Sequence, residues 1–226
     1  MAYRSTKMAK TFFLSLLLFL TATVFAQSGC PAFWSDIQQF KKADSAQPPP
    51  KNAILFVGSS SFTKWTDVQE YFPNYTIINR GFGGSQLTDV IRYFYDVILP
   101  YAPKQVVIYC GENDLASPVM RPADVVLRFK TLFGMIRQNL PATTIDFISL
   151  KPSPSRSVYF TKFKEANAEI KTFLAGQKNA AFIDVYGAML APDGQPQADI
   201  FLNDNLHLNA KGYRIWQKAI LPFLKK

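Results

Sequence analysis

The chain contains little of the two residue types that most often bind transition metals. It has one histidine and two cysteines among 226 residues, and these are spread along the sequence. A zinc site needs three or four clustered nitrogen or sulfur ligands, so we expect no metal and no cofactor. Cys110 ends an apolar run, which predicts a buried free thiol. A Cys30–Cys110 disulfide is compatible with an oxidising compartment, although no pattern favours it.

Long apolar runs are missing except near the N-terminus. Met1–Lys10 carries three basic residues and no acidic one, and the apolar run Thr11–Phe25 follows. This run is shorter than the roughly 20 residues of a membrane span. The pattern predicts a secretory signal peptide, residues 1–26, cleaved after Ala26. Lipoprotein processing at Cys30 is the second alternative, which the polar Gln27 disfavours. Both alternatives place the mature chain outside the cytoplasm, either secreted or in the periplasm or cell envelope.

Clusters of basic residues are also rare. Without the three basic residues of the leader, 22 basic residues face 16 acidic ones, a net charge of +6. Lys41-Lys42 and Lys225-Lys226 are the only adjacent lysine pairs. A nucleic-acid-binding surface needs basic residues gathered on one face, so we expect no nucleic-acid partner. Residues 27–226 have the size of a single domain, and they contain no long amphipathic element for a lipid surface.

Five short apolar runs predict buried strands, and longer helical patterns alternate with them. The predicted strands are Ala53–Val57, Tyr75–Asn79, Gln105–Cys110, Thr144–Ser149 and Ala181–Val185. The predicted helices are Pro31–Lys42, Thr66–Tyr71, Leu87–Leu99, Ala123–Asn139, Val158–Gly176 and Asn209–Leu224. This alternation implies right-handed crossovers, and hence an α/β fold with a five-stranded parallel sheet between two helical layers.

Polar and glycine-rich segments follow the first three predicted strands. They are Gly58–Ser61, Asn79–Ser85 and Gly111–Asp114, and a fourth polar segment, Asn203–Asn209, precedes the last helix. In open parallel sheets, ligands bind beyond the carboxyl ends of the strands. We therefore expect all four segments at one edge of the sheet, where a site would form.

The residues of these segments suit acyl transfer by a serine. His207 is the only histidine, and Asp204, three residues earlier, could hold its ring by a hydrogen bond to Nδ1–H. Ser60 is a hydroxyl that such a base could activate. The Ser60 and Gly84 backbone N–H groups and the Asn113 side chain could stabilise an oxyanion. Taken singly, Ser60 also fits a helix N-cap, and His207 and Asp204 fit a polar surface.

Taken in order, the segments resemble the conserved blocks of the SGNH hydrolases, also called the GDSL-like esterase/lipase family. Ile54–Trp65 resembles the first block, with Gly58-Ser59-Ser60 in place of Gly-Asp-Ser. Asn79–Gly84, Gly111–Asp114 and Asp204–Asn209 resemble the second, third and fifth blocks. The resemblance covers essentially the whole mature chain, and the serine variant is most similar to the branch named after platelet-activating-factor acetylhydrolase.

This resemblance implies a flavodoxin-like, three-layer α/β/α sandwich and a serine esterase that needs no cofactor. It also implies that Ser60, His207 and Asp204 are catalytic and that Ser60, Gly84 and Asn113 form the oxyanion hole. Chain spacing to Trp65 favours Ser60 as the nucleophile, with Ser61 as the main rival.

The residues outside the blocks are less informative. Arg80 and Arg156 could shape the pocket or be surface charges, and Lys151–Arg156 is expected to form a rim loop without assigned chemistry. We expect hydrolysis of short-chain acyl esters, above all acetyl esters, of a carbohydrate or, second, of a lipid. The alternative is a catalytically silent carbohydrate-binding module on the same fold. Nothing in the sequence indicates an oligomeric state.

Overall fold

Five parallel strands form the centre of the structure. The computed structural model describes residues 30–226, so the predicted signal peptide lies outside the described residues. The strands are β1 (Ile54–Gly58), β2 (Ile77–Gly81), β3 (Gln105–Tyr109), β4 (Thr144–Ile148) and β5 (Ala180–Ile183). They pair in the order β2-β1-β3-β4-β5, which is the flavodoxin-like order. The predicted α/β fold with a five-stranded parallel sheet is therefore confirmed.

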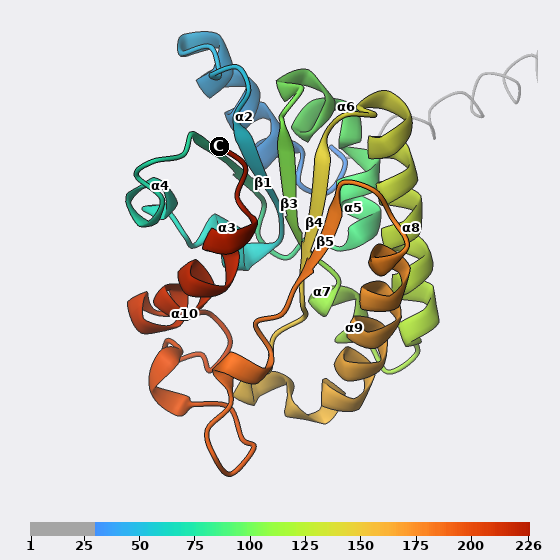
Figure 1. Cartoon of the computed structure of the whole chain (residues 1–226), viewed down its shortest axis with the longest axis vertical. Helices are drawn as coiled ribbons and strands as arrows, with labels where there is room; N and C mark the ends of the chain where they lie inside the picture. The colour runs from blue at the N-terminus through green and yellow to red at the C-terminus, as the bar shows by residue number, and fades with distance from the viewer. Residues whose placement is uncertain (1–29) are drawn as a thin grey trace, which may run out of the picture. The chain divides into compact units, whose positions relative to one another are not determined.

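Helices cover both faces of this sheet. Figure 1 shows α5, α8 and α9 on one side and α3, α4 and α10 on the other. The bounds of these six helices are α3 Ser60–Thr63, α4 Val68–Tyr71, α5 Leu87–Arg92, α8 Pro122–Asn139, α9 Phe160–Ala175 and α10 Ala210–Ile220. The other helices are α2 Trp34–Ala46, α6 Phe94–Val97 and α7 Glu112–Leu115, and short 3-10 turns lie at Leu99–Tyr101, Pro154–Tyr159, Gly187–Met189, Ala198–Ile200 and Leu221–Phe223.

The central strands are apolar on both faces because both faces are packed. Every residue of β1, β3 and β4 is buried. On one face Phe56 packs against Phe62 of α3, with ring centroids 5.0 Å apart. On the other, Phe147 packs against Phe129 of α8 at 4.7 Å. The edge strands β2 and β5 are only partly buried, so the expectation that all five strands are buried on both faces was wrong for these two.

Two further expectations need correction. The predicted helix Leu87–Leu99 is interrupted at Tyr93, whose ψ of 17° ends α5 and whose ring packs edge-on against Phe82. The predicted rim loop Lys151–Arg156 is buried at its start, because Lys151 and Ser153 are 1% and 0% exposed. The buried Lys151 ammonium pairs with the Glu112 carboxylate.

Other predicted features are found as expected. Cys110 is a buried free thiol, and Cys30 is also free and exposed. Arg80 does not line the carboxyl-edge cluster described below: its guanidinium pairs with Asp44 of α2, and its Nε donates to the Tyr101 hydroxyl at 2.6 Å. Among the helices of residues 30–226, none combines the length and apolar character that crossing a bilayer requires.

Candidate active site

A serine, a histidine and an aspartate meet at the carboxyl edge of the sheet. His207 Nε2 lies 2.9 Å from Ser60 Oγ, and His207 Nδ1 lies 2.6 Å from Asp204 Oδ2. Ser60 is the first residue of α3 and His207 lies on the loop just before α10, so the contact joins the segment after β1 to the segment before the last helix. Both nitrogens of the ring therefore have partners, which fixes the orientation of the imidazole.

The loop that carries His207 is built around the Asp204 carboxylate. Asp204 Oδ1 accepts hydrogen bonds from the backbone N–H groups of Leu206 (3.0 Å) and His207 (2.9 Å), and Asn205, the residue after Asp204, takes a left-handed φ of 53°. Partial burial raises the pKa of Asp204, but the hydrogen bonds from the His207 ring and from these two amides outweigh it and hold the pKa below its usual range. Asp204 is therefore an anion that faces the imidazole.

The turn from β1 into α3 fixes which of the three serines meets the histidine. Gly58 has φ +142°, and a Cβ there would lie 2.0 Å from the Tyr109 carbonyl oxygen, so only glycine fits. Ser59 N–H donates to that same carbonyl at 3.0 Å. Ser61 is 2% exposed, and its carbonyl accepts from the Tyr213 hydroxyl at 2.8 Å. Only Ser60 places its hydroxyl beside His207.

The predicted oxyanion donors lie on two neighbouring segments. Asn113, on the four-residue helix α7, donates from Nδ2 to Ser59 Oγ (2.7 Å) and to the Ser85 carbonyl (3.1 Å). Gly84 is exposed in a turn with φ +86°. Its neighbour Gly83 lies close to Ser60, since a Cβ on Gly83 would be 3.8 Å from the Ser60 Cβ. The Asn113 amide and the glycine turn thus border the serine turn.

Several residues around this cluster were not predicted from the sequence. Ser59 contacts Asn113, although the serine run gave no sign of which serine would do so. Glu112, which directly precedes Asn113 in the chain, forms a buried ion pair with Lys151 at 2.8 Å. Their separation of 39 residues leaves no periodic signal. The one sequence signal that could have indicated Lys151 is a basic residue shortly after a buried strand.

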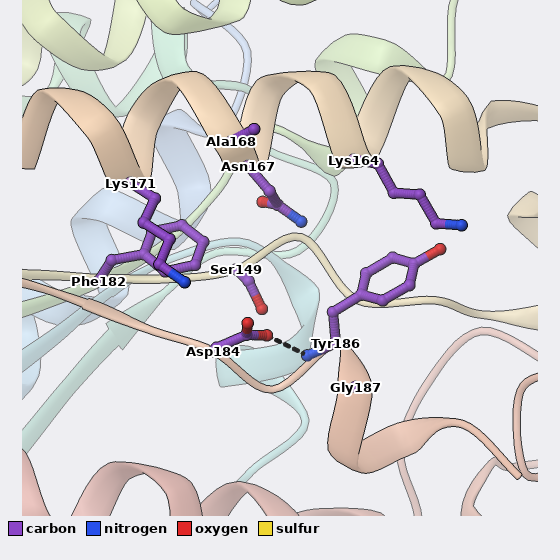
Figure 2. Close-up of a pocket in the computed structure, with 9 residues that line it drawn as sticks. All are labelled: Ser149, Lys164, Asn167, Ala168, Lys171, Phe182, Asp184, Tyr186 and Gly187. Atoms are coloured by element: carbon purple, nitrogen blue, oxygen red, sulfur yellow. Dashed lines mark hydrogen bonds between the residues drawn. The ribbon is translucent and has the colours of Figure 1, made fainter. Parts of the chain in front are cut away.

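A groove lies between α9 and β5, at the edge of the sheet. It has a volume of about 330 Å³, and none of its lining residues is a predicted site residue. Figure 2 shows two aromatic rings, each with a lysine over it: Lys164 Nζ is 5.7 Å from the Tyr186 ring centroid, and Lys171 Nζ is 6.0 Å from that of Phe182. Asp184 also lines the groove, and its Oδ1 accepts from Tyr186 N–H.

No group of three or more histidine, cysteine or acidic side chains suited to hold a metal ion occurs within residues 30–226. The cluster at the carboxyl edge consists of a serine, a histidine, an aspartate and amide donors. Such a constellation on a parallel sheet fits the class of serine hydrolases.

Comparison with known proteins identifies the family. The sequence model of the GDSL-like Lipase/Acylhydrolase family matches residues 50–215, which is most of the chain and includes every residue of the cluster. The chain belongs to this family, and it is a carboxylic ester hydrolase. A search of curated protein sequences found no match.

Solved structures share the fold at low sequence identity. A Streptococcus pneumonia protein described provisionally as a platelet activating factor has a TM-score of 0.75 and 21% identity, covering 98% of this chain and 100% of its own. A GDSL-like lipase from Bacteroides thetaiotaomicron has a TM-score of 0.71 and 19% identity, and the match covers 82% of this chain and 95% of the lipase. A catalytic mutant of an acetylxylan esterase from Geobacillus stearothermophilus has a TM-score of 0.61 and 15% identity, and the match covers 77% of this chain and 94% of the esterase.

Proposed function

We propose that this ester hydrolase works through an acyl-enzyme formed on Ser60. Ser60 Oγ attacks the ester carbonyl while its proton passes to His207 Nε2. The imidazolium then gives that proton to the departing alcohol as the carbon–oxygen bond breaks. Water, deprotonated by His207, attacks the acyl-enzyme, releases the carboxylic acid and restores the Ser60 hydroxyl. Asp204 holds the ring and stabilises the imidazolium.

The observation that carries this proposal is the 2.9 Å contact between Ser60 Oγ and His207 Nε2. The two residues are 147 positions apart in the chain, so the fold alone brings them together. The second ring nitrogen already faces the Asp204 anion. A nucleophile, a base within hydrogen-bond reach and a group that orients the base form the arrangement that nucleophilic acyl transfer requires.

We assign the stabilisation of the oxyanion to the backbone N–H groups of Ser60 and Gly84 and to the Asn113 side chain. Both N–H bonds of the Asn113 amide are in use, one to the Ser59 hydroxyl and one to the Ser85 carbonyl. When the Ser59 side chain rotates away, the Asn113 N–H that it had accepted becomes free to donate to the oxyanion. A donor held in place before the reaction is worth more than one that must be recruited.

As substrate we propose an acetylated carbohydrate, with a short-chain lipid ester as the second choice. The fold likeness to an acetylxylan esterase supports the first. The groove between α9 and β5 supports it further, because it combines the aromatic residues Tyr186 and Phe182 with the polar groups Asp184 and Lys164. Small-molecule sites typically combine apolar walls with a few polar groups in this way.

The test compares the three adjacent serines. Ser60→Ala should abolish labelling by a fluorophosphonate probe and lower the kcat for p-nitrophenyl acetate by roughly 10⁴-fold or more, because the nucleophile is lost. Ser61→Ala should keep the labelling, since the buried Ser61 does not contact His207. Ser59→Ala should also keep it, with a reduced rate because the Asn113 side chain loses a hydrogen bond that holds it in place. Peptide mass spectrometry locates the adduct.

An adduct on Ser61 together with an active Ser60→Ala variant contradicts the assignment of the nucleophile. A folded native protein that neither binds the probe nor turns over p-nitrophenyl acetate contradicts the whole mechanism. That second result favours the catalytically silent carbohydrate-binding module.

A further inference from the structure

A charged pair lies almost completely buried beside the proposed site. The side chains of Lys151 and Glu112 are 1% and 7% exposed, and Lys151 Nζ donates to Glu112 Oε2 at 2.8 Å. The Tyr109 hydroxyl donates to the same oxygen, and the Ser153 hydroxyl reaches Oε1 at 3.3 Å. Burying two charges is costly, and a buried pair often stabilises a fold no better than apolar residues do. Stability alone is therefore a weak explanation for it.

The pair adjoins the proposed oxyanion donor. Glu112 directly precedes Asn113 on α7, a helix of only four residues. A single helical turn is not stable by itself, so contacts of the neighbouring side chains must hold the Asn113 amide in place. On the other side, Asp114 accepts from Leu87 N–H (3.1 Å) and from Arg128 Nη1 (2.7 Å). Buried carboxylates thus fix α7 before and after Asn113.

The pair also connects to the loop that carries the proposed base. Lys151 and Ser153 belong to the segment after β4. Two residues further on, Ser155 N–H donates to the Asn205 carbonyl at 3.1 Å, and Asn205 lies two residues before His207. Hydrogen bonds therefore tie the segment after β4 both to α7, which carries the oxyanion donor, and to the loop that carries the base.

We propose that the Lys151–Glu112 pair is a positioning element for ester hydrolysis. The pair fixes the position of the Asn113 amide relative to the Ser60 hydroxyl and to the loop that carries His207. This inference rests on the proposed function of Asn113 and His207. A displacement of about 1 Å in a catalytic group can cost roughly 100-fold in rate, so rigid support under a one-turn helix has a direct effect on kcat.

The first test separates positioning from stability. Lys151→Met leaves the Glu112 carboxylate buried and unpaired, so we expect a lower Tm and a kcat reduced roughly 10- to 100-fold, with the KM for p-nitrophenyl acetate nearly unchanged. Glu112→Gln/Lys151→Met removes both charges and keeps an acceptor for the Tyr109 hydroxyl. We expect its Tm to return toward the native value while kcat stays low. Recovery of kcat together with Tm overturns the proposal and makes the pair purely structural.

The second test is a double-mutant cycle with Asn113. If the pair acts through this amide, Lys151→Met should cost much less in an Asn113→Ala background than in the native enzyme, because coupled residues are not additive. Equal costs in both backgrounds overturn the proposal. If Asn113→Ala alone leaves kcat unchanged, the oxyanion assignment fails instead, so the two failures are distinguishable.

The matched control is another ion pair, outside the carboxyl-edge cluster. Asp44→Asn weakens the contact of α2 with Arg80 and the Tyr101 hydroxyl. It should lower Tm and leave kcat within about twofold of the native value, because, within residues 30–226, this pair and the Tyr101 hydroxyl make no hydrogen bond to the residues of the carboxyl-edge cluster. A fall in kcat as large as that of Lys151→Met would show that kcat follows global stability and would overturn the proposal.

Discussion

His207 can accept a proton from Ser60 only when its imidazole is neutral. Activity should therefore rise with pH through a single ionisation and fall in acid, because the imidazolium cannot act as base. His207→Ala should lower kcat by roughly 10⁴-fold or more, while circular dichroism shows an unchanged fold. A pH–rate profile of p-nitrophenyl acetate hydrolysis measures the first effect.

Asp204→Asn is the milder change in the same contact. Its amide oxygen can still accept the Leu206 and His207 backbone N–H groups, so the loop should keep its shape. Its NH2 group, however, would face His207 Nδ1 and favour the wrong tautomer, so we expect a loss of roughly 10²- to 10⁴-fold, less than for Ser60→Ala. A folded His207→Ala enzyme with a near-native rate would end the triad assignment.

Asp146 makes a prediction about stability that is independent of catalysis. It is 1% exposed, its Oδ1 has no hydrogen-bond partner, and its Oδ2 accepts from Gln105 Nε2. Burial raises the pKa of Asp146 to about 6, although the Gln105 hydrogen bond opposes the rise. Because the folded pKa exceeds the unfolded one, the free energy of unfolding should increase as pH falls from about 6 to about 4.

Asp146→Asn should remove this pH dependence. It should raise the free energy of unfolding at pH 8 by roughly 2–3 kcal/mol, since one pKa unit corresponds to about 1.4 kcal/mol, and it should change little below pH 4. Urea titrations of both proteins at several pH values measure the difference. Parallel curves for variant and native protein between pH 4 and 7 would contradict the assignment.

Single residues also mark the limit of prediction from the sequence. The glycine and serine pattern indicated a nucleophile in the segment Gly58–Ser61, but three adjacent serines gave alternatives. The choice depends on tertiary contacts: Ser59 meets Asn113, and the Ser61 carbonyl meets Tyr213. Such contacts join residues more than 50 positions apart, so no local pattern contains them.

Strands and long helices could be predicted because the residue pattern within each element determines it, whereas one-turn helices could not. The strands were found within about two residues, because a run of apolar residues between turns leaves few alternatives. The long helices α8 and α9 were found for their apolar periodicity. The one-turn helices α3 and α7 were not, because tertiary contacts rather than propensity hold them. The break at Tyr93, whose ring packs against Phe82, was also missed.

The groove between α9 and β5 makes a prediction at the level of these two elements. If it contacts a carbohydrate chain, Tyr186→Ala should raise the KM for acetylated xylan several-fold and leave p-nitrophenyl acetate turnover unchanged, because this small ester has no sugar units that could contact the groove. Thr172→Ala, an exposed residue of α9 that does not line the groove, is the matched control. Equal KM values for native and Tyr186→Ala enzyme on the polymer would remove the groove from substrate binding.

At the scale of the molecule, the site exists because parallel strands end together. Ser60 follows β1, Asn113 follows β3, and His207 lies on the loop before α10. Each segment carries one group that is ordinary by itself, and the strand order places β1 and β3 side by side. The order of polar segments along the chain therefore predicted which side chains the fold brings together, whereas the buried contact of Lys151 with Glu112 could be found only in three dimensions.

The basic residues of Met1–Lys10 and the apolar run Thr11–Phe25 predict that the protein is exported. We propose that residues 1–26 direct secretion and are removed after Ala26, because a basic start, a short apolar run and small residues at its end form a signal peptide. The exported protein should begin at Gln27 and incorporate no palmitate, which N-terminal sequencing and fatty-acid labelling measure. Incorporation that Cys30→Ser abolishes and Cys110→Ser leaves unchanged would establish a lipid anchor at Cys30 instead. Full-length protein retained in the cytoplasm would contradict export by either route, since both remove the basic N-terminus.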